Sequence, residues 1–237
     1  MRLLPRVSLS FLRVICSAGI LSMLFAADGG PVYAAPADPT LIYQESAGKA
    51  VKHFQWRRAS AAQEEVITVT EEDATFVNHC DRTGRTLAWH FRQGRQTEIQ
   101  VVRDGNLLKI AGILQGNKID TIESIDDRPW YQPLSFSLRS FLDSPEEKIS
   151  FWMVRTDSLE FVTMQAEKVG VEEVTVAGRQ VRARKVEIRR EGLLASFWHA
   201  AFWFREADQV FVRYQGIHGP PGTHETVVQL MKEFQKR

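Results

Sequence analysis

The sequence predicts a mainly β protein built on a single highly curved antiparallel sheet, an open half-barrel of about a dozen strands with one or two short helices. Apolar residues alternate with their neighbours over most of the chain, and Gly- and Asn-containing turn signals separate these runs. The 237 residues are 44% hydrophobic and carry 30 Lys+Arg against 29 Asp+Glu. This composition excludes a disordered chain and is typical of one globular domain.

Residues 1–34 have the layout of a secretory signal, with a basic start, an apolar stretch and small or apolar residues at the end. We therefore expect cleavage near Ala34, a periplasmic or secreted protein, and a single β-rich domain over residues 35–237. An uncleaved membrane anchor is the alternative. However, Arg13 leaves only residues 14–27 free of charge, which is short for a bilayer span.

Removal of this signal changes both the charge and the cysteine count. The signal contains three Arg and one Asp, so the mature chain has 27 basic and 28 acidic residues and keeps one cysteine, Cys80. A chain so close to neutral gives no reason to expect nucleic acid as a partner, and one cysteine excludes an internal disulfide. We expect Cys80 to be buried, with pairing to a second chain as the alternative. No stretch after the signal is apolar enough to cross a membrane.

The first half of the mature chain indicates consecutive antiparallel strands joined by short turns. The expected strands are 66–70, 76–80, 87–91, 99–101 and 108–110, with another from Ile119. Asp104-Gly105 and Gly116-Asn117 predict two-residue hairpin loops because these residues tolerate positive φ.

One segment departs from this alternation. A Pro-rich stretch over residues 129–133 precedes residues 135–142, whose apolar spacing fits a short helix with Ser135 as its N-cap and Pro145 as its stop. We expect this helix to pack over one mouth of the sheet. A connecting helix without a functional role is the alternative.

The strands resume after the helix. The expected strands are 149–153, 159–163, 174–176, 181–183, 186–188 and 210–214. Gly178-Arg179 fits a type II′ hairpin loop, and a change of phase at Arg184-Lys185 predicts a β-bulge that bends the strand. Residues 226–231 fit either a closing strand or a short helix.

The strand expected over residues 196–204 is apolar on both faces. Phe197, His199, Ala201 and Trp203 share one face, whereas Trp198, Ala200, Phe202 and Phe204 share the other. Neither side of such a strand can face free water.

The C-terminal half resembles an uncharacterised family of exported bacterial envelope proteins. The residues that carry this resemblance are 173–187, 202–204, 210–214 and the Gly-Pro-Pro-Gly run at 219–222. The sheets of this family look like those of the lipoprotein-carrier proteins of the Gram-negative periplasm, a half-barrel with helices over its concave face. The resemblance implies this architecture and a concave face that holds acyl chains. It carries over no functional residue.

The aromatic content independently predicts an apolar ligand. The mature chain keeps all six Trp and 12 of the 14 Phe, and one short helix cannot cover the concave face of a sheet of a dozen strands. Either side chains fill this face or an apolar cavity remains, and such cavities bind apolar ligands. The lining candidates are Trp89, Phe91, Phe151, Trp152, Phe161, Trp198, Phe202 and Trp203. The expected function is non-enzymatic binding of a lipid, acyl chain or lipoprotein in the periplasm. The alternatives are a filled aromatic core in an envelope scaffold protein and an outer apolar face that docks on a partner.

Catalytic and metal motifs are absent from the sequence. It has no Gly-x-Ser-x-Gly elbow, no His-Glu-x-x-His, no P-loop and no dinucleotide fingerprint, so we expect no cofactor, metal or catalytic residue. His79 and Cys80 lie on opposite faces of their strand and cannot form a nucleophile pair. His79 and His90 share a face if Thr83-Gly84 is a two-residue turn, but two His without a third ligand make a weak metal site. A metal-dependent hydrolase is therefore the most distant alternative.

Overall fold

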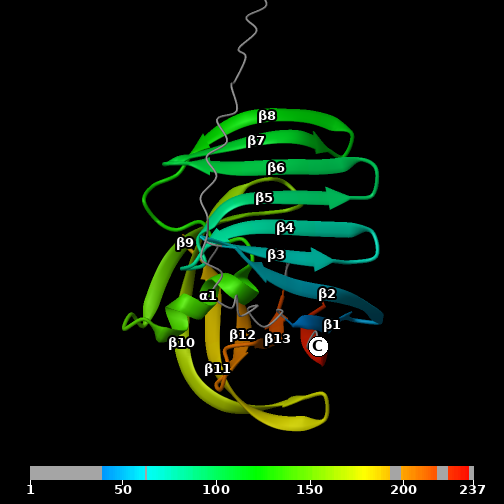
Figure 1. The fold of residues 1–237 in the computed structure, drawn as a ribbon, viewed down its shortest axis with the longest axis vertical. Helices are drawn as coiled ribbons and strands as arrows, with labels where there is room; N and C mark the ends of the chain where they lie inside the picture. Colours follow the sequence, from blue (N-terminus) through cyan, green and yellow to red (C-terminus); the bar gives the residue numbers. More distant parts are fainter. Residues whose placement is uncertain (1–38, 62, 193–198, 218–223, 235–237) are drawn as a thin grey trace, which may run out of the picture. The chain divides into compact units, whose positions relative to one another are not determined.

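The computed structural model describes residues 39–61, 63–192, 199–217 and 224–234, and within them it contains fourteen strands and one α-helix (Figure 1). The first eight strands are β1 (Thr40–Ala47), β2 (Ala50–Ser60), β3 (Glu64–Thr70), β4 (Ala74–Asp81), β5 (Thr86–Gln93), β6 (Thr97–Asp104), β7 (Leu107–Leu114) and β8 (Asn117–Ser124). They are followed by α1 (Leu134–Asp143), β9 (Lys148–Val154), β10 (Phe161–Val176), β11 (Arg179–Arg190), β12 (His199–Arg205), β13 (Phe211–Gly216) and β14 (Thr226–Phe234). The expected signal, residues 1–34, lies outside the described residues.

The strands form one antiparallel sheet in the order β8-β7-β6-β5-β4-β3-β2-β1-β14-β13-β12-β11-β10-β9. The end strands β8 and β9 do not pair with each other, so the sheet remains open. The predicted open half-barrel is therefore confirmed, with fourteen strands in the described part rather than about a dozen. Because β1 pairs with both β2 and β14, the first and last strands of the described chain join the two halves of the sheet. Residues 226–231 are thus part of a strand.

The predicted hairpin loops are correct in place but wrong by one residue. Pairing of Asp104 with Leu107, of Leu114 with Asn117 and of Val176 with Arg179 puts the loops at 105–106, 115–116 and 177–178. Residues 177 and 178 both have positive φ, 48° and 77°, as in a type I′ rather than a type II′ turn. A glycine fits either central position of such a loop, so the register of the strands decides which residues form it.

The predicted β-bulge lies beside the expected residues of β11, but the extra residue is on the neighbouring strand, β10. The register between β10 and β11 shifts between Lys168 and Gly170, opposite Lys185 and Val186. The extra residue therefore belongs to β10, and the phase change that the sequence shows in β11 is its counterpart.

Helix α1 spans nearly the range that the sequence predicted. It buries Phe136, Leu138 and Phe141 against inward residues of the sheet. Its N-cap is Pro133, and no side chain caps it. The expected N-cap, Ser135, lies within the first turn instead.

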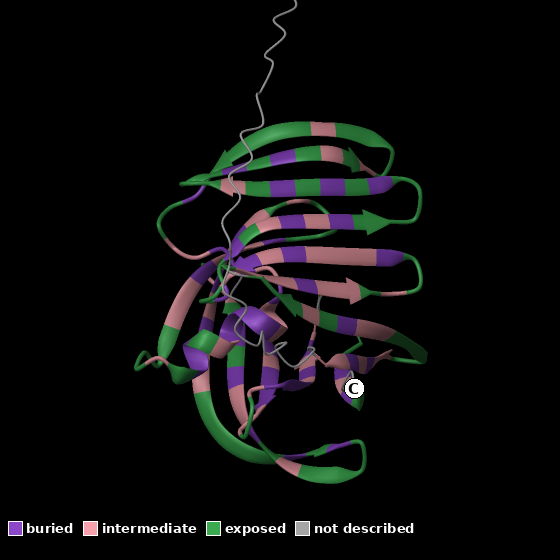
Figure 2. Ribbon diagram, viewed as in Figure 1, coloured by how far each residue is buried: buried purple, intermediate pink, exposed green. Residues whose placement is uncertain are grey.

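The buried side chains form two clusters. The larger cluster joins α1 to residues of β1–β4 and β9–β14, and the smaller one lies between β4–β7 and the segment from Ile125 to Val154. Buried and exposed residues alternate along β6 and β7 (Figure 2). This alternation means that these strands have one face in the core and the other in solvent.

A short extended segment before α1 connects β9, at one end of the sheet, with β5. The backbone N–H of Tyr131 donates to the carbonyl of Trp152 at 2.9 Å, and the N–H of Trp152 donates to the carbonyl of Pro129 at 2.8 Å. On its other side, the carbonyl of Trp130 accepts a bond from the N–H of Thr86 at 2.8 Å. The segment thus satisfies part of the backbone of β9, which would otherwise be an unpaired edge.

The long β10–β11 hairpin explains why both faces of β12 are apolar. Phe202 packs with the aromatic residues of β13, whereas Trp203 points to the opposite face and is still only 6% exposed. The indole N–H of Trp203 donates to Glu172 of β10, and the cations of Lys185 and Arg213 lie 5.5 and 5.4 Å from its ring. Both faces are therefore covered at Phe202 and Trp203, as the sequence predicted.

Candidate functional site

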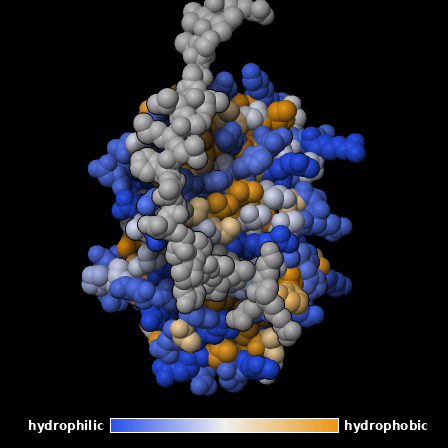
Figure 3. All heavy atoms as spheres, in the orientation of Figure 1, coloured by the Kyte–Doolittle hydropathy of each residue, from blue (hydrophilic) through white to orange (hydrophobic). Residues whose placement is uncertain are grey.

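A cavity of about 380 Å³ lies on the inner face of the sheet, between strands from its two halves and the start of α1. It is lined by Tyr43, Glu45, Phe54, Trp56, Val69, Glu71, Phe76, Asn78, Trp89, Gln132, Pro133, Leu134, Ser135, Thr156, Phe202, Phe211, Tyr214 and Val228. Twelve of these eighteen residues are aromatic or aliphatic, the composition typical of a small-molecule site. In the space-filling view of Figure 3, hydrophobic residues lie among hydrophilic ones around β4 and β5.

Tyr43 is the centre of the aromatic wall. Its ring stacks on Phe54 at 5.2 Å between centroids and contacts Phe211 at 5.3 Å. Its hydroxyl donates to the backbone carbonyl of Phe211 at 2.7 Å, which joins β1 to β13 across β14. Tyr214 meets Phe202 edge to face at 5.0 Å. Burial raises the pKa of both tyrosines well above the ordinary value, so the wall is uncharged at neutral pH.

The residues just before and within the first turn of α1 form another side of the cavity, and they are held by hydrogen bonds. Ser135 Oγ accepts a bond from the indole N–H of Trp56 at 3.2 Å. Gln132 accepts bonds from the backbone N–H of Val154 at 3.0 Å and from the indole of Trp130 at 3.1 Å, and it donates to the carbonyl of Val154 at 2.8 Å. This side of the cavity is therefore tied to both β2 and β9.

Two carboxylates, Glu45 and Glu71, form an acidic rim. Their side chains are 24% and 20% exposed, and both pair with the half-exposed Lys52, at 3.4 and 3.1 Å. Burial alone would lower the pKa of Lys52, but its bonds to Glu71 and Glu45 outweigh burial and raise that pKa. Lys52 does not line the cavity, and neither does any other Lys or Arg of the described residues. The rim is therefore net negative.

Asn78 is the buried polar residue of the lining. It is 3% exposed, and its Oδ1 has no hydrogen-bond partner among the described residues. Ile67 of β3 and Trp89 of β5 lie opposite it on the two neighbouring strands. The sequence analysis did not single out Asn78, although the alternation along β4 puts it on the same inward face as Phe76 and Cys80.

Two of the eight aromatic residues that the sequence singled out, Trp89 and Phe202, line the cavity. Phe91 and Phe151 lie on inward faces but are buried within the clusters themselves. Phe91 stacks on Trp89 at 5.6 Å between ring centroids, beside it on the same face of β5. An inward position therefore does not by itself place a side chain at the cavity.

The remaining candidates lie elsewhere. Trp152 and Phe161 pack at the edge of the smaller cluster, where the indole N–H of Trp152 donates to Asp126 at 2.8 Å. Trp203 faces outward beneath the β10–β11 hairpin, and Trp198 lies outside the described residues.

Three of the eight lining aromatics come from strands that the sequence did not delineate. Tyr43, Phe54 and Trp56 belong to β1 and β2, which precede the first strand expected from the sequence. The signal was present, because Tyr43 alternates with Leu41, and Phe54 with Trp56, at the period of two of a strand.

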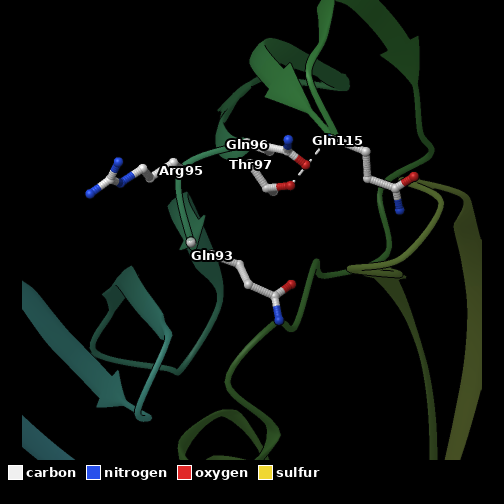
Figure 4. A pocket seen from close by; sticks show the side chains of 6 residues that line it. Gln93, Arg95, Gln96, Thr97 and Gln115 are labelled. Carbon is white, nitrogen blue, oxygen red and sulfur yellow. Dashed lines mark hydrogen bonds between the residues drawn. The ribbon is translucent and has the colours of Figure 1, made fainter.

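A second hollow, of about 450 Å³, lies at the β5–β6 and β7–β8 turns. Its lining is polar apart from Gly94, and the backbone N–H of Gln115 donates to Thr97 Oγ1 at 3.1 Å (Figure 4). Arg95 points away from these two residues. The side chains do not converge on a common point, so this hollow has no arrangement that recognises a ligand.

The His and Cys residues of β4 and β5 form no catalytic arrangement. His79 pairs with Ala88 as predicted, but Cys80 pairs with Thr86, so Thr83-Gly84 is not a two-residue turn. The His79 and His90 rings contact Glu64 and Glu98, at 3.3 and 3.2 Å. Burial raises the pKa of the Cys80 thiol to about 12, and its expected burial is confirmed.

Neither a cluster of metal ligands nor a membrane-spanning helix occurs in the described ranges. No three His, Cys, Asp or Glu side chains gather there as metal ligands. The helix in this part of the chain is too short to span a membrane.

Neither a protein-family model nor a curated protein matches the chain. Among solved structures, it is similar to a beta-barrel-like protein of a domain of unknown function, DUF1849, from Brucella abortus. The TM-score is 0.59 at 9% identity, over 86% of this chain and 99% of that one. This likeness shows a shared fold.

Two further solved structures are more distant. The hypothetical lipoprotein YmcC from Escherichia coli has a TM-score of 0.39 at 12% identity, covering 82% of this chain and 84% of its own. A lipoprotein from Parabacteroides distasonis has a TM-score of 0.35 at 7% identity, covering 83% and 95%.

Proposed function

We propose that this protein binds the alkyl or acyl chain of an amphiphile, such as a lipid or a lipid-modified protein, in the cavity on the inner face of its sheet, without catalysing a reaction. The aromatic cavity of about 380 Å³ is the observation that carries the proposal. Its volume is within the range of roughly 300–1,000 Å³ that is usual for small-molecule sites. An alkyl chain in this cavity would gain about 25 cal/mol of binding free energy for each Å² of apolar surface that it removes from water.

The architecture supports binding over a filled core. The walls come from both halves of the sheet, and the bond from Tyr43 to Phe211 fixes one wall, while the bonds of Gln132 fix the opposite side. Rigid walls keep a hollow from collapsing, and an apolar ligand then gains the contacts that the lining lacks. The sequence resemblance to an uncharacterised exported envelope family, whose sheets look like those of lipoprotein carriers, and the export signal expected in residues 1–34 are consistent with a role in the cell envelope.

A cavity-filling substitution tests the proposal. Val69 lies in the lining and is only partly buried, so Val69→Trp puts an indole into the space that a ligand would take. We expect this variant to lose at least about 90% of its uptake of the neutral fluorescent probe N-phenyl-1-naphthylamine, while its circular dichroism spectrum stays unchanged.

Val51→Trp is the matched control, because Val51 is on an adjacent strand and 58% exposed. It should bind the probe like the wild type. Equal uptake by Val69→Trp and the wild type would contradict binding in this cavity.

A further inference from the structure

One buried polar atom of the cavity lining, Asn78 Oδ1, has no hydrogen-bond partner among the described residues. Asn78 is 3% exposed, Ile67 and Trp89 lie opposite it on the flanking strands, and Phe76 and Cys80 share its face of β4. An amide in such a place costs free energy unless it finds a hydrogen-bond partner, because the alternative of bonding to bulk water is lost. The amide can rotate by half a turn, which lets it present either its carbonyl or its N–H₂ group to a molecule in the cavity.

Glu71 of the acidic rim lies at the turn between β3 and β4, away from Asn78. The backbone N–H of Glu71 bonds to the carbonyl of Ala74, and Asn78 is four residues further along β4. At about 3.3 Å per residue, the two polar ends are separated by roughly 13 Å along the strand. Aromatic and aliphatic side chains, such as Val69 and Phe76, line the cavity between them.

We propose that the ligand is an amphiphile with a polar group at each end of a medium-length alkyl chain. A hydroxyl or amide pairs with Asn78, and an uncharged or cationic head lies at the Glu45–Glu71 rim. This inference rests on the proposed function and narrows its ligand class.

The charge of the rim decides the choice of head. Glu45 and Glu71 share the single ammonium of Lys52, which lies outside the lining, and the described part of the chain puts no Lys or Arg in the lining itself. A phosphate or carboxylate head would place a like charge beside two partly buried carboxylates, where water screens poorly. An amine or a neutral head meets no such repulsion.

The buried amide decides the choice at the other end. A plain alkyl terminus would leave Asn78 Oδ1 without a partner, whereas a terminal hydroxyl supplies both a donor and an acceptor. Sites built around a buried polar group discriminate against analogues that lack its partner.

The test is a competition in which amphiphiles displace the naphthylamine probe from the full mature protein. The three competitors are dodecylamine, the same amine with a hydroxyl on its terminal carbon, and dodecanoate with the same terminal hydroxyl. We expect the hydroxylated amine to bind at least about fivefold more tightly than dodecylamine, and also more tightly than the hydroxylated carboxylate.

In Asn78→Leu the preference for the hydroxyl should disappear, while in the exposed control Asn117→Leu it should persist. Glu71→Gln should reduce the preference for the amine over the carboxylate, and the neighbouring exposed Glu72→Gln should not.

The outcomes separate this inference from the proposed function. Equal affinities of the two amines for the wild type would overturn it at Asn78, because the amide would then be satisfied by water alone. Equal affinities of the amine and the carboxylate would overturn it at the rim. If no amphiphile and no probe binds at all, the proposed function itself fails. The comparison of ligands on the wild type decides the case even if Asn78→Leu does not fold.

Discussion

Replacing Gln132 by Leu should destabilise the protein strongly, although Leu has a similar size and is apolar. The Gln132 side chain makes three hydrogen bonds, two with the backbone of Val154 and one with the indole of Trp130. Both partner residues are at most 2% exposed, so no bulk water replaces these bonds when the amide is removed. At a net value of about 0.5–1.5 kcal/mol for each bond, with an added cost for polar groups left buried and unpaired, the expected loss is about 2–4 kcal/mol.

Urea unfolding followed by tryptophan fluorescence measures this loss. With a slope of about 2 kcal/mol/M, the midpoint should fall by about 1–2 M while the slope stays unchanged. Gln100→Leu is the control, because Gln100 is on the exposed face of β6, and this change should stay within about 0.5 kcal/mol of the wild type. A loss below about 1 kcal/mol for Gln132→Leu would refute the idea that this side chain ties the segment before α1 to the edge of the sheet.

Three other substitutions or treatments give distinct expectations. Gly112→Ala should lower the free energy of unfolding, measured in urea, by about 3 kcal/mol or more, because the new Cβ would lie 2.0 Å from the Glu98 carbonyl oxygen at a φ of +142°. Gly170→Ala is the control. Gly170 has a similar φ of +144° but open space around it, so this change should cost about 1–2 kcal/mol. Asn78→Leu should raise the melting temperature of the ligand-free protein by the equivalent of about 1–2 kcal/mol, and a lower melting temperature would show that Asn78 has a partner. The Cys80 thiol, with its pKa near 12, should react with iodoacetamide at pH 8 only as fast as the protein unfolds, and fast labelling of the folded protein would contradict its burial.

The strand content followed from the sequence because a half-buried strand imposes a period of two on the chain. The helix was equally visible from its apolar spacing, since Phe136, Leu138 and Phe141 all face the core. The two-sided apolar character of β12 correctly implied that both of its faces are covered. The sequence could not show that the β10–β11 hairpin is what covers Trp203, because this contact depends on how far the two long strands bend.

The position of the cavity was harder to derive. Alternation shows which residues face inward but not which inward residues meet a hollow and which meet another wall. Trp89 and Phe151 are equivalent in pattern, yet only Trp89 lines the cavity, because Phe151 packs on Tyr131 of the segment before α1. That segment reaches β9 through backbone bonds that no side-chain pattern encodes.

Native mass spectrometry of the protein, purified without detergent from cells that produce it, tests most directly whether this cavity binds a ligand. We expect a bound amphiphile that is lost on delipidation and regained on incubation with the hydroxylated amine, whereas Val69→Trp should carry no ligand at any stage. A wild-type protein that shows only its own mass, both as purified and after incubation with each amphiphile, would contradict the claim that this cavity is a binding site.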